Sequence, residues 1–180
     1  MCGMLGASAF RMPVYKLPVN MLTPRVTSQI NTVVQQAWPG KPGALKYAMY
    51  NWVAMVQDQG QIVGVVFTRK SEAWTYVEKL AVLPAYRKQG VAHSLLEYIH
   101  SEVDPGNAHV LHVDPGAEHD ALVSYYTKRG FESVYSNATE TMLRRDAYAA
   151  VVGRQDAPKN ELQHDPSVLW GFDRRDFPRQ

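Results

Sequence analysis

Short apolar runs, separated by glycine, proline and polar residues, predict several β-strands along the chain. The stretches predicted to be strands are 14–19, 52–57, 61–69, 73–83, 108–114, 131–135 and 140–145. Asp58-Gln59-Gly60 lies between the second and third of these and is typical of a hairpin turn. Ser136-Asn137-Ala138 joins the last two in the same way, so two antiparallel hairpins are expected.

Two further segments show the helical spacing of apolar residues, and a third is weaker. The first begins at Thr23-Pro24, an N-cap followed by a first-turn proline, and continues to Ala37. The run "WPGKPG" from Trp38 to Gly43 ends it, and a short helix over 44–50 is the weaker prediction. The second strong helix, 87–103, carries its apolar stripe at Ala92, Leu95, Leu96, Ile99 and Val103.

A later helix is predicted over 117–130, where Gly130 suits a left-handed C-cap. With it, the elements follow the order β-α-(α)-β-β-β-α-β-α-β-β, which predicts an α+β domain around a mixed sheet. The helix between the strand ending at Leu83 and the strand starting at Ala108 is a crossover connection. Those two strands are therefore expected to be parallel.

The chain has 180 residues, of which 46% are hydrophobic, enough for one domain with a core. We predict a flexible N-terminus over 1–12, the folded domain over 13–146 and a tail over 147–180. The tail is polar and proline-rich, which favours a segment that wraps the domain or is partly disordered. Trp170 and Phe172 are its candidates for docking.

Composition indicates which cellular compartment and which classes of partner to expect. Cys2 is the single cysteine, so an internal disulfide is excluded and a reducing compartment is favoured. The sequence shows neither a signal-peptide pattern nor an apolar run of about 18 residues, so we expect a cytoplasmic protein that does not bind membranes. A net charge of +2 gives no footprint for nucleic acid, and a homodimer is left open.

The stretch "VLPAYRKQGVAHSLLEYI", Val82 to Ile99, places a basic, glycine-bearing turn directly before a helix. The first N–H groups of a helix have no partner within it, and together with the helix dipole they attract anions. Gly90 would let a phosphate approach the backbone, and Arg87 and Lys88 add positive charge. The alternative is a solvated basic turn, in which the glycine only supplies dihedral freedom.

Two motifs resemble the GNAT superfamily of N-acetyltransferases. Arg87-Lys88-Gln89-Gly90-Val91-Ala92 matches its acetyl-CoA loop Q/R-x-x-G-x-G/A, with alanine at the last position. "HDALVSYYTKRGFE", from His119 to Glu132, is similar to the later helix of that family, which ends in Tyr-x-x-x-Gly-Phe. The resemblance implies a mostly antiparallel sheet flanked by helices, whose central parallel pair splays apart. It also implies acetyl-CoA as co-substrate.

The resemblance further implies which residues bind the cofactor. Backbone groups of the strand before the loop would pair with the pantetheine amides, and the loop would hold the pyrophosphate. His119 stands where family members often carry the asparagine that contacts the cofactor arm. The implied cofactor-binding residues are Leu80, Ala81, Val82, Arg87, Lys88, Gln89, Gly90, Val91, Ala92, His93, His119 and Tyr126.

Acetyl transfer requires a neutral amine, so a base must accept the amine's proton. Glu78 is the candidate, because its position resembles the strand glutamate of spermidine/spermine acetyltransferases and strand alternation puts it on one face with Tyr76, Leu80 and Val82. The alternative is a carboxylate paired with a neighbouring strand. Tyr126 holds the family's tyrosine position, and its phenol would protonate the departing thiolate, unless it is only a half-buried aromatic. A backbone N–H near Val82 would hold the thioester oxyanion.

The acceptor side is expected to be built from 30–51 and 135–141, with Trp38, Tyr47 and Tyr76 as substrate-binding residues. Because 1–57 contains no Asp or Glu, a small amine or amino acid whose other groups are neutral or anionic fits best. A protein lysine or N-terminal acetyltransferase and a non-catalytic acyl-CoA-binding module are the alternatives. No metal is expected, because the five histidines of the predicted helices and strands are scattered without a ligand spacing; these five are His93, His100, His109, His112 and His119.

Overall fold

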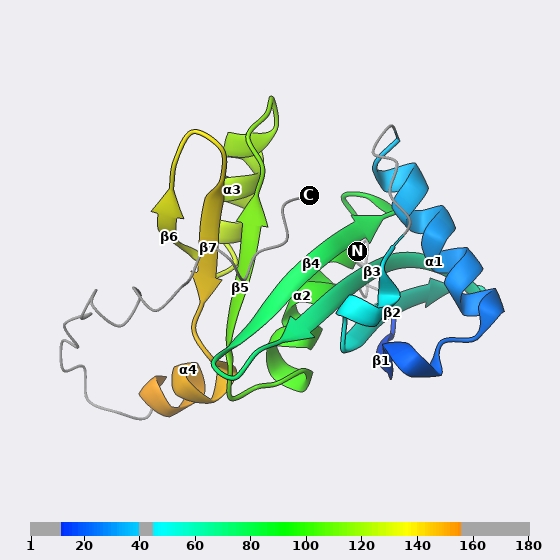
Figure 1. Ribbon diagram of the computed structural model, residues 1–180, viewed down its shortest axis with the longest axis horizontal. Helices are drawn as coiled ribbons and strands as arrows, with labels where there is room; N and C mark the ends of the chain where they lie inside the picture. Colours follow the sequence, from blue (N-terminus) through cyan, green and yellow to red (C-terminus); the bar gives the residue numbers. More distant parts are fainter. Residues whose placement is uncertain (1–11, 40–44, 156–180) are drawn as a thin grey trace, which may run out of the picture.

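The computed structural model describes residues 12–39 and 45–155 (Figure 1). The predicted flexible N-terminus therefore lies almost wholly outside the described residues, as do Trp170 and Phe172 of the tail. The described part forms one mixed sheet of seven strands in the order β1-β2-β3-β4-β5-β7-β6. Its strands are β1 (Val14–Pro18), β2 (Trp52–Asp58), β3 (Gln61–Lys70), β4 (Trp74–Val82), β5 (Ala108–Val113), β6 (Glu132–Ser136) and β7 (Thr141–Arg145).

The predicted parallel pair is confirmed, and it comes apart after three residues. Trp74, Thr75 and Tyr76 of β4 pair with Ala108, His109 and Val110 of β5, and every other pairing in the sheet is antiparallel. Beyond these pairs the two strands diverge, so the sheet opens into two wings (Figure 1). The fold class, including the splayed central pair, agrees with the prediction.

Helices cover both faces of the larger of the two wings, the one formed by β1 to β4. The helices are α1 (Pro24–Ala37), α2 (Val91–Glu102), α3 (His119–Thr127) and α4 (Tyr148–Gln155). Phe67 of β3 contacts the Tyr47 ring, whose hydroxyl bonds to Asn31 of α1. Three residues earlier, Gly64 faces the opposite side: a Cβ there would lie 2.5 Å from Val91 of α2. This close approach explains why β3 carries a glycine in an otherwise bulky apolar run.

Several predicted boundaries shift for local backbone reasons. Thr23 caps α1 as predicted, its side chain accepting a hydrogen bond from the Val26 N–H at 3.4 Å. The helix predicted to begin at Arg87 begins at Val91 instead, because Lys88 and Gly90 have φ of 62° and 82°, which a right-handed helix does not allow. The helix predicted over 44–50 is wrong as well: only a 3-10 turn, Tyr47–Met49, forms there.

The first part of the predicted tail, which starts at residue 147, is helical. Residues Tyr148–Gln155 form α4, and the Tyr148 ring lies edge-on to His100 of α2 at 5.5 Å between centroids. The predicted helix over 117–130 is shorter, His119–Thr127, and Gly130 follows it with φ of 82° as expected of a C-cap. The folded part therefore extends at least one helix beyond residue 146.

A pair of histidines is buried between α2 and β5. His109 is 1% exposed, its Nε2 bonds to the Val103 carbonyl at 3.2 Å, and its ring lies 5.4 Å from that of His100. Burial, with the His100 ring and Arg145 nearby, lowers the pKa of His109 to about 4, against the opposing influence of Asp104. Burial also lowers the pKa of His100. Both rings are therefore neutral when the protein is folded at neutral pH.

This pair predicts that the protein loses stability in mild acid. An unfolded histidine binds a proton near pH 6.5, whereas folded His109 resists protonation down to about pH 4. The free energy of unfolding should therefore fall as the pH drops from about 6.5 to about 4, by up to about 3 kcal/mol from His109. Urea unfolding across this range should show the loss in the wild type and less of it in His109→Gln, while the exposed-site variant His112→Gln should match the wild type. Equal losses in all three would contradict the prediction.

Candidate functional site

A cavity of about 210 Å³ lies at the end of β4 that has diverged from β5. It is bounded by the end of α1, the end of β4, the turn before α2 and one side of α3. The lining residues are Ala37, Trp38, Leu80, Ala81, Val82, Arg87, Ala92, Leu122, Tyr125 and Tyr126. Six of the twelve predicted cofactor-binding residues are among them, so elements distant in sequence meet at one cavity; the six are Leu80, Ala81, Val82, Arg87, Ala92 and Tyr126.

A β-bulge in β4 shapes the wall of this cavity. Glu78 lies opposite Phe67 of β3, whereas Ala81 lies opposite Val65, so Lys79 and Leu80 together face a single residue. Lys79 has φ of 52°, the left-handed conformation that accommodates the extra residue. The ladder to β3 is interrupted there, and backbone groups of β4 are released from pairing next to the cavity.

The bulge corrects one prediction about β4. Strict alternation puts Tyr76, Glu78, Leu80 and Val82 on one face, but this holds only for Tyr76 and Glu78. After the bulge Val82 lies opposite Gly64, on the face that packs against α2. Alternation fails because it assumes one residue per partner residue, and the sequence carries no clear sign of the insertion.

The turn before α2 has the features of an anion site. Gly90 is the N-cap of α2 with φ of 82°, and no side chain of residues 12–39 and 45–155 caps the helix, so its first N–H groups have no side-chain partner there. In the same part of the chain, a Cβ on Gly90 would meet no atom within 4 Å, which leaves room for a ligand to approach the backbone. The positive end of the helix dipole adds to the attraction for a phosphate.

The side chains of this turn have different surroundings. Arg87 reaches the cavity and donates from Nη2 to the Ala37 carbonyl at 3.3 Å, which ties the turn to the end of α1. Gln89 donates to the Ala85 carbonyl at 2.9 Å. Val91 is buried against the sheet, whereas Lys88 and His93 are exposed. Gln89 and Val91 therefore offer a ligand mainly their backbone, and Lys88 and His93 offer exposed side chains.

Tyr126 of α3 presents a protonated phenol at the cavity. Its ring is packed edge-on between Tyr125, at 5.3 Å, and Phe131, at 5.8 Å between centroids. Burial and the neighbouring Tyr125 phenol raise the pKa of Tyr126 to about 12, outweighing the opposing effect of Arg129. At neutral pH the phenol is therefore protonated.

Glu78 lies on the α1 face of β4, outside the cavity lining. Arg69 of β3 donates from Nε to Glu78 Oε1 at 3.1 Å, and the Arg69 guanidinium lies 4.5 Å from the centroid of the Tyr76 ring. The cross-strand ion pair named as the alternative for Glu78 is thus present. Both side chains of the pair stay about one quarter exposed, at 26% and 23%, so the pair also faces solvent.

Two further predicted site residues, Tyr47 and His119, do not line the cavity. The Tyr47 hydroxyl donates to Asn31 Oδ1 at 2.7 Å, its pKa is raised to about 12 by burial, and it lies outside the cavity lining. Both ring nitrogens of His119 are engaged, Nδ1 with Asp120 and Nε2 with the Thr141 hydroxyl, each at 2.9 Å. A contact from His119 to the cofactor arm therefore stays a prediction, and it would require an exchange of partners.

Sequence reasoning missed Arg69 and assigned no role to Leu122 or Tyr125. Tyr125 and Leu122 lie on the same side of α3 as Tyr126, and both line the cavity. Arg69 is found only once the register of the β3–β4 hairpin is known, because that register puts it opposite Tyr76. Within residues 12–39 and 45–155, no group of three metal-ligating side chains is present, and no helix is long and apolar enough to cross a membrane.

Comparison with known sequences places these features in a family. The model of the acetyltransferase (GNAT) domain matches residues 28–144. A curated relative, the [ribosomal protein bS18]-alanine N-acetyltransferase of Escherichia coli K12, is 31% identical over 78 residues, which are 43% of this chain and 48% of the relative. The chain thus spans about half the length of the curated relatives it matches.

Solved structures share the fold at low sequence identity. An acyl-CoA N-acyltransferase from Pseudomonas aeruginosa superimposes with a TM-score of 0.64 at 14% identity, over 75% of this chain and 99% of that one. The ribosomal-protein-S18-alanine N-acetyltransferase of Escherichia coli gives 0.60 at 18% identity, over 75% and 94%. An aminoglycoside 6'-N-acetyltransferase complexed with coenzyme A gives 0.62 at 16%, over 83% and 100%.

Proposed function

Because the chain belongs to the acetyltransferase (GNAT) family, we propose that it moves an acetyl group from acetyl-CoA to a primary amine. The observation that carries this proposal is the cavity at the splay between β4 and β5. It joins the released backbone of β4, the uncapped N-terminus of α2 and the protonated phenol of Tyr126. The β4 backbone suits the amide-bearing arm of acetyl-CoA, and the α2 N-terminus suits its pyrophosphate. The Tyr126 phenol suits the thiolate leaving group.

The chain's own groups would act in sequence. The N–H groups at Gly90 to His93 hold the pyrophosphate, and the β4 backbone from Leu80 to Val82 orients the thioester. Glu78 first accepts a proton from the ammonium form of the acceptor, directly or through water. The neutral amine nitrogen then forms a bond to the acetyl carbon, and a β4 N–H near Val82 stabilises the negative oxygen. When the carbon–sulfur bond breaks, Tyr126 gives its proton to the sulfur and is reprotonated by the remaining extra proton of the acetylated nitrogen, directly or through water.

Glu78 is the proposed acceptor of the ammonium proton, and a pH profile tests it. Glu78→Gln should lower turnover about 10-fold near pH 7 and recover toward the wild-type rate at higher pH, because more of the amine is then already neutral. The matched control is Glu97→Gln, which also removes a carboxylate from an arginine pair, 2.8 Å from Arg145, but outside the cavity. A Glu78→Gln defect that is the same at every pH would remove Glu78 as the base.

A small-molecule amine or amino acid is the favoured acceptor. The residues before 58, which supply α1 and the turn at Tyr47–Met49, contain no carboxylate to attract a polycation. A protein N-terminus or lysine is the second candidate, and what favours it is the 31% identity with an enzyme whose name gives a protein alanine as its substrate. A binding module without catalysis would retain the cofactor cavity but release no coenzyme A.

Release of free thiol from acetyl-CoA separates these candidates. Purified protein would be incubated with acetyl-CoA and a panel of small amines, amino acids and peptides, and scored for thiol and for acetylated product. Thiol release that depends on a small amine supports the proposal, and release only with peptides supports the second candidate. Binding of acetyl-CoA without amine-dependent release with any acceptor would overturn the enzymatic function.

A further inference from the structure

Arg69 lies next to Glu78 and has no role in the proposed chemistry. It is the penultimate residue of β3, opposite Tyr76 in the register and diagonal to Glu78. Its Nε is bonded to Glu78 and its guanidinium is stacked on Tyr76, so two neighbours hold the plane of the side chain. An arginine fixed in this way loses little conformational freedom when it binds a ligand.

The outer edge of this guanidinium is open to a partner. Within residues 12–39 and 45–155, Arg69 donates its hydrogen bond from Nε and none from Nη1 or Nη2, and the side chain is 26% exposed. The two Nη atoms present the fork that binds a carboxylate with two parallel hydrogen bonds. The Arg69–Glu78 ion pair therefore presents two adjacent groups of opposite charge. The Glu78 carboxylate can bind an ammonium group, and the Arg69 guanidinium can bind an anion.

We propose that the Arg69–Glu78 pair selects an acceptor that carries a carboxylate next to its amine, that is, a free α-amino acid. The inference rests on the proposed function and narrows its acceptor. The amine and carboxylate of an α-amino acid are separated by one carbon, which matches two oppositely charged groups already 3.1 Å apart. Arg69 would bind the carboxylate while Glu78 accepts the proton from the amine.

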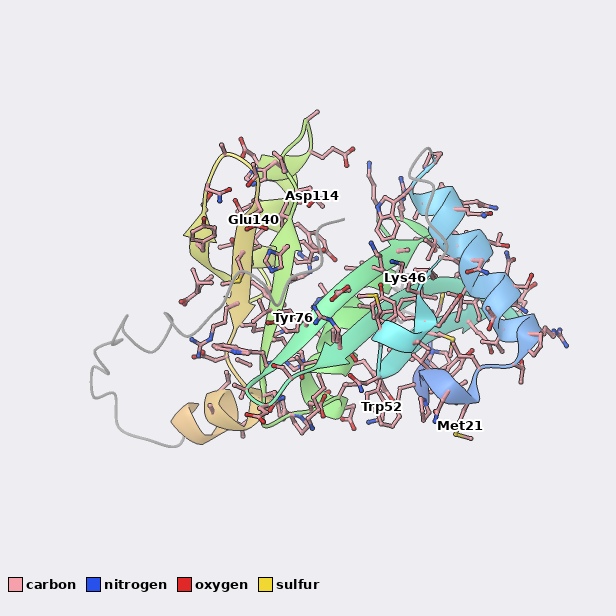
Figure 2. The ribbon with its side chains drawn as sticks, viewed as in Figure 1. Met21, Lys46, Trp52, Tyr76, Asp114 and Glu140 are labelled. Atoms are coloured by element: carbon pink, nitrogen blue, oxygen red, sulfur yellow. The ribbon has the colours of Figure 1, made fainter. Side chains whose placement is uncertain are left out.

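The surrounding charges agree with this assignment. The α1 side of the pair, residues 12–39 and 45–57 of the described chain, adds cations such as the exposed Lys46 and no carboxylate. Asp114 and Glu140, which would favour a cationic acceptor, lie far from Tyr76 toward the other end of β5 and β7 (Figure 2). Glu140 is moreover partnered by His112, at 3.4 Å.

The experiment compares each free amino acid with its own primary amide, which keeps the side chain and the amine but removes the carboxylate. We expect kcat/KM to favour the amino acid about 10- to 100-fold, the usual effect of a charge-assisted hydrogen bond. In Arg69→Gln this ratio should fall toward 1, mainly through a higher KM for the amino acid. In Arg69→Lys, which keeps the charge without the fork, the ratio should be intermediate.

Arg144→Gln is the matched control, because Arg144 also has a carboxylate partner, Asp146 at 3.1 Å, and lies 5.1 Å from the Trp74 ring centroid. It should keep the wild-type ratio. Equal rates with acids and amides, a preference for diamines or peptides, or a ratio unchanged in Arg69→Gln would overturn the inference while leaving acetyl transfer established. Absence of thiol release with every acceptor would instead overturn both.

Discussion

Replacement of Tyr126 by phenylalanine should lower the rate of the chemical step by about 100- to 10,000-fold, the range expected when a general acid is lost. The phenol is positioned by ring contacts with Tyr125 and Phe131, which phenylalanine preserves. Only the proton donor at the cavity is removed. Single-turnover formation of thiol with saturating acceptor measures this step, and calorimetry measures the affinity for coenzyme A, which should change little.

Tyr125→Phe provides the control for this variant. Tyr125 is adjacent in sequence, lines the same cavity and also has its pKa raised by burial. Its ring is stacked against the Arg129 guanidinium at 3.5 Å, so its role is assigned to packing. A loss of rate in Tyr125→Phe as large as in Tyr126→Phe, or a parallel loss of coenzyme A affinity in Tyr126→Phe, would show that the tyrosine is structural.

The pH profile gives a second check on Tyr126. Because burial raises its pKa to about 12, the phenol stays protonated throughout the range in which the protein can be assayed. The wild-type rate should therefore show no decline from this group between neutral pH and about pH 11. A fall centred near pH 10, the ordinary value for tyrosine, would mean that the donor is a more exposed phenol.

The order of elements and the parallel central pair were predictable, because they follow from periodicity and from the topology of crossover connections. The splay of that pair was implied only by the resemblance to the GNAT superfamily. The strand at 73–83 and the strand at 108–114 must be parallel if a single helix joins them. The N-cap at Thr23 and the C-cap at Gly130 were predictable for a similar reason: each depends on a few adjacent residues whose chemistry is specific.

The bulge and the ion pair at Glu78 were not predictable in the same way. The bulge depends on Lys79 adopting a positive φ, and lysine has no preference for that conformation. Arg69 meets Glu78 only because the hairpin register puts β3 and β4 in that alignment, which a one-residue slip would change. Long-range register, more than local composition, decides which side chains meet at this site.

The anion site at the start of α2 leads to the prediction with the largest expected effect. Gly90→Leu should abolish binding of acetyl-CoA, because the new side chain would occupy the open space that a pyrophosphate needs to reach the backbone N–H groups. The change also forces a non-glycine residue to φ of 82°, which costs about 1–2 kcal/mol of stability. The loss of acetyl-CoA binding must be distinguished from the loss of stability, and a variant at a second glycine allows this.

Gly60 in the β2–β3 turn has nearly the same conformation as Gly90, with φ of 81°, and a Cβ there also meets no atom within 4 Å. Gly60→Leu should therefore lose similar stability while keeping the cofactor site. Coenzyme A at 100 times its Kd should stabilise the wild type and Gly60→Leu by about 3 kcal/mol and leave Gly90→Leu unchanged. If coenzyme A stabilises both variants equally, the pyrophosphate does not bind at Gly90, and the α2 N-terminus is only a solvated basic turn.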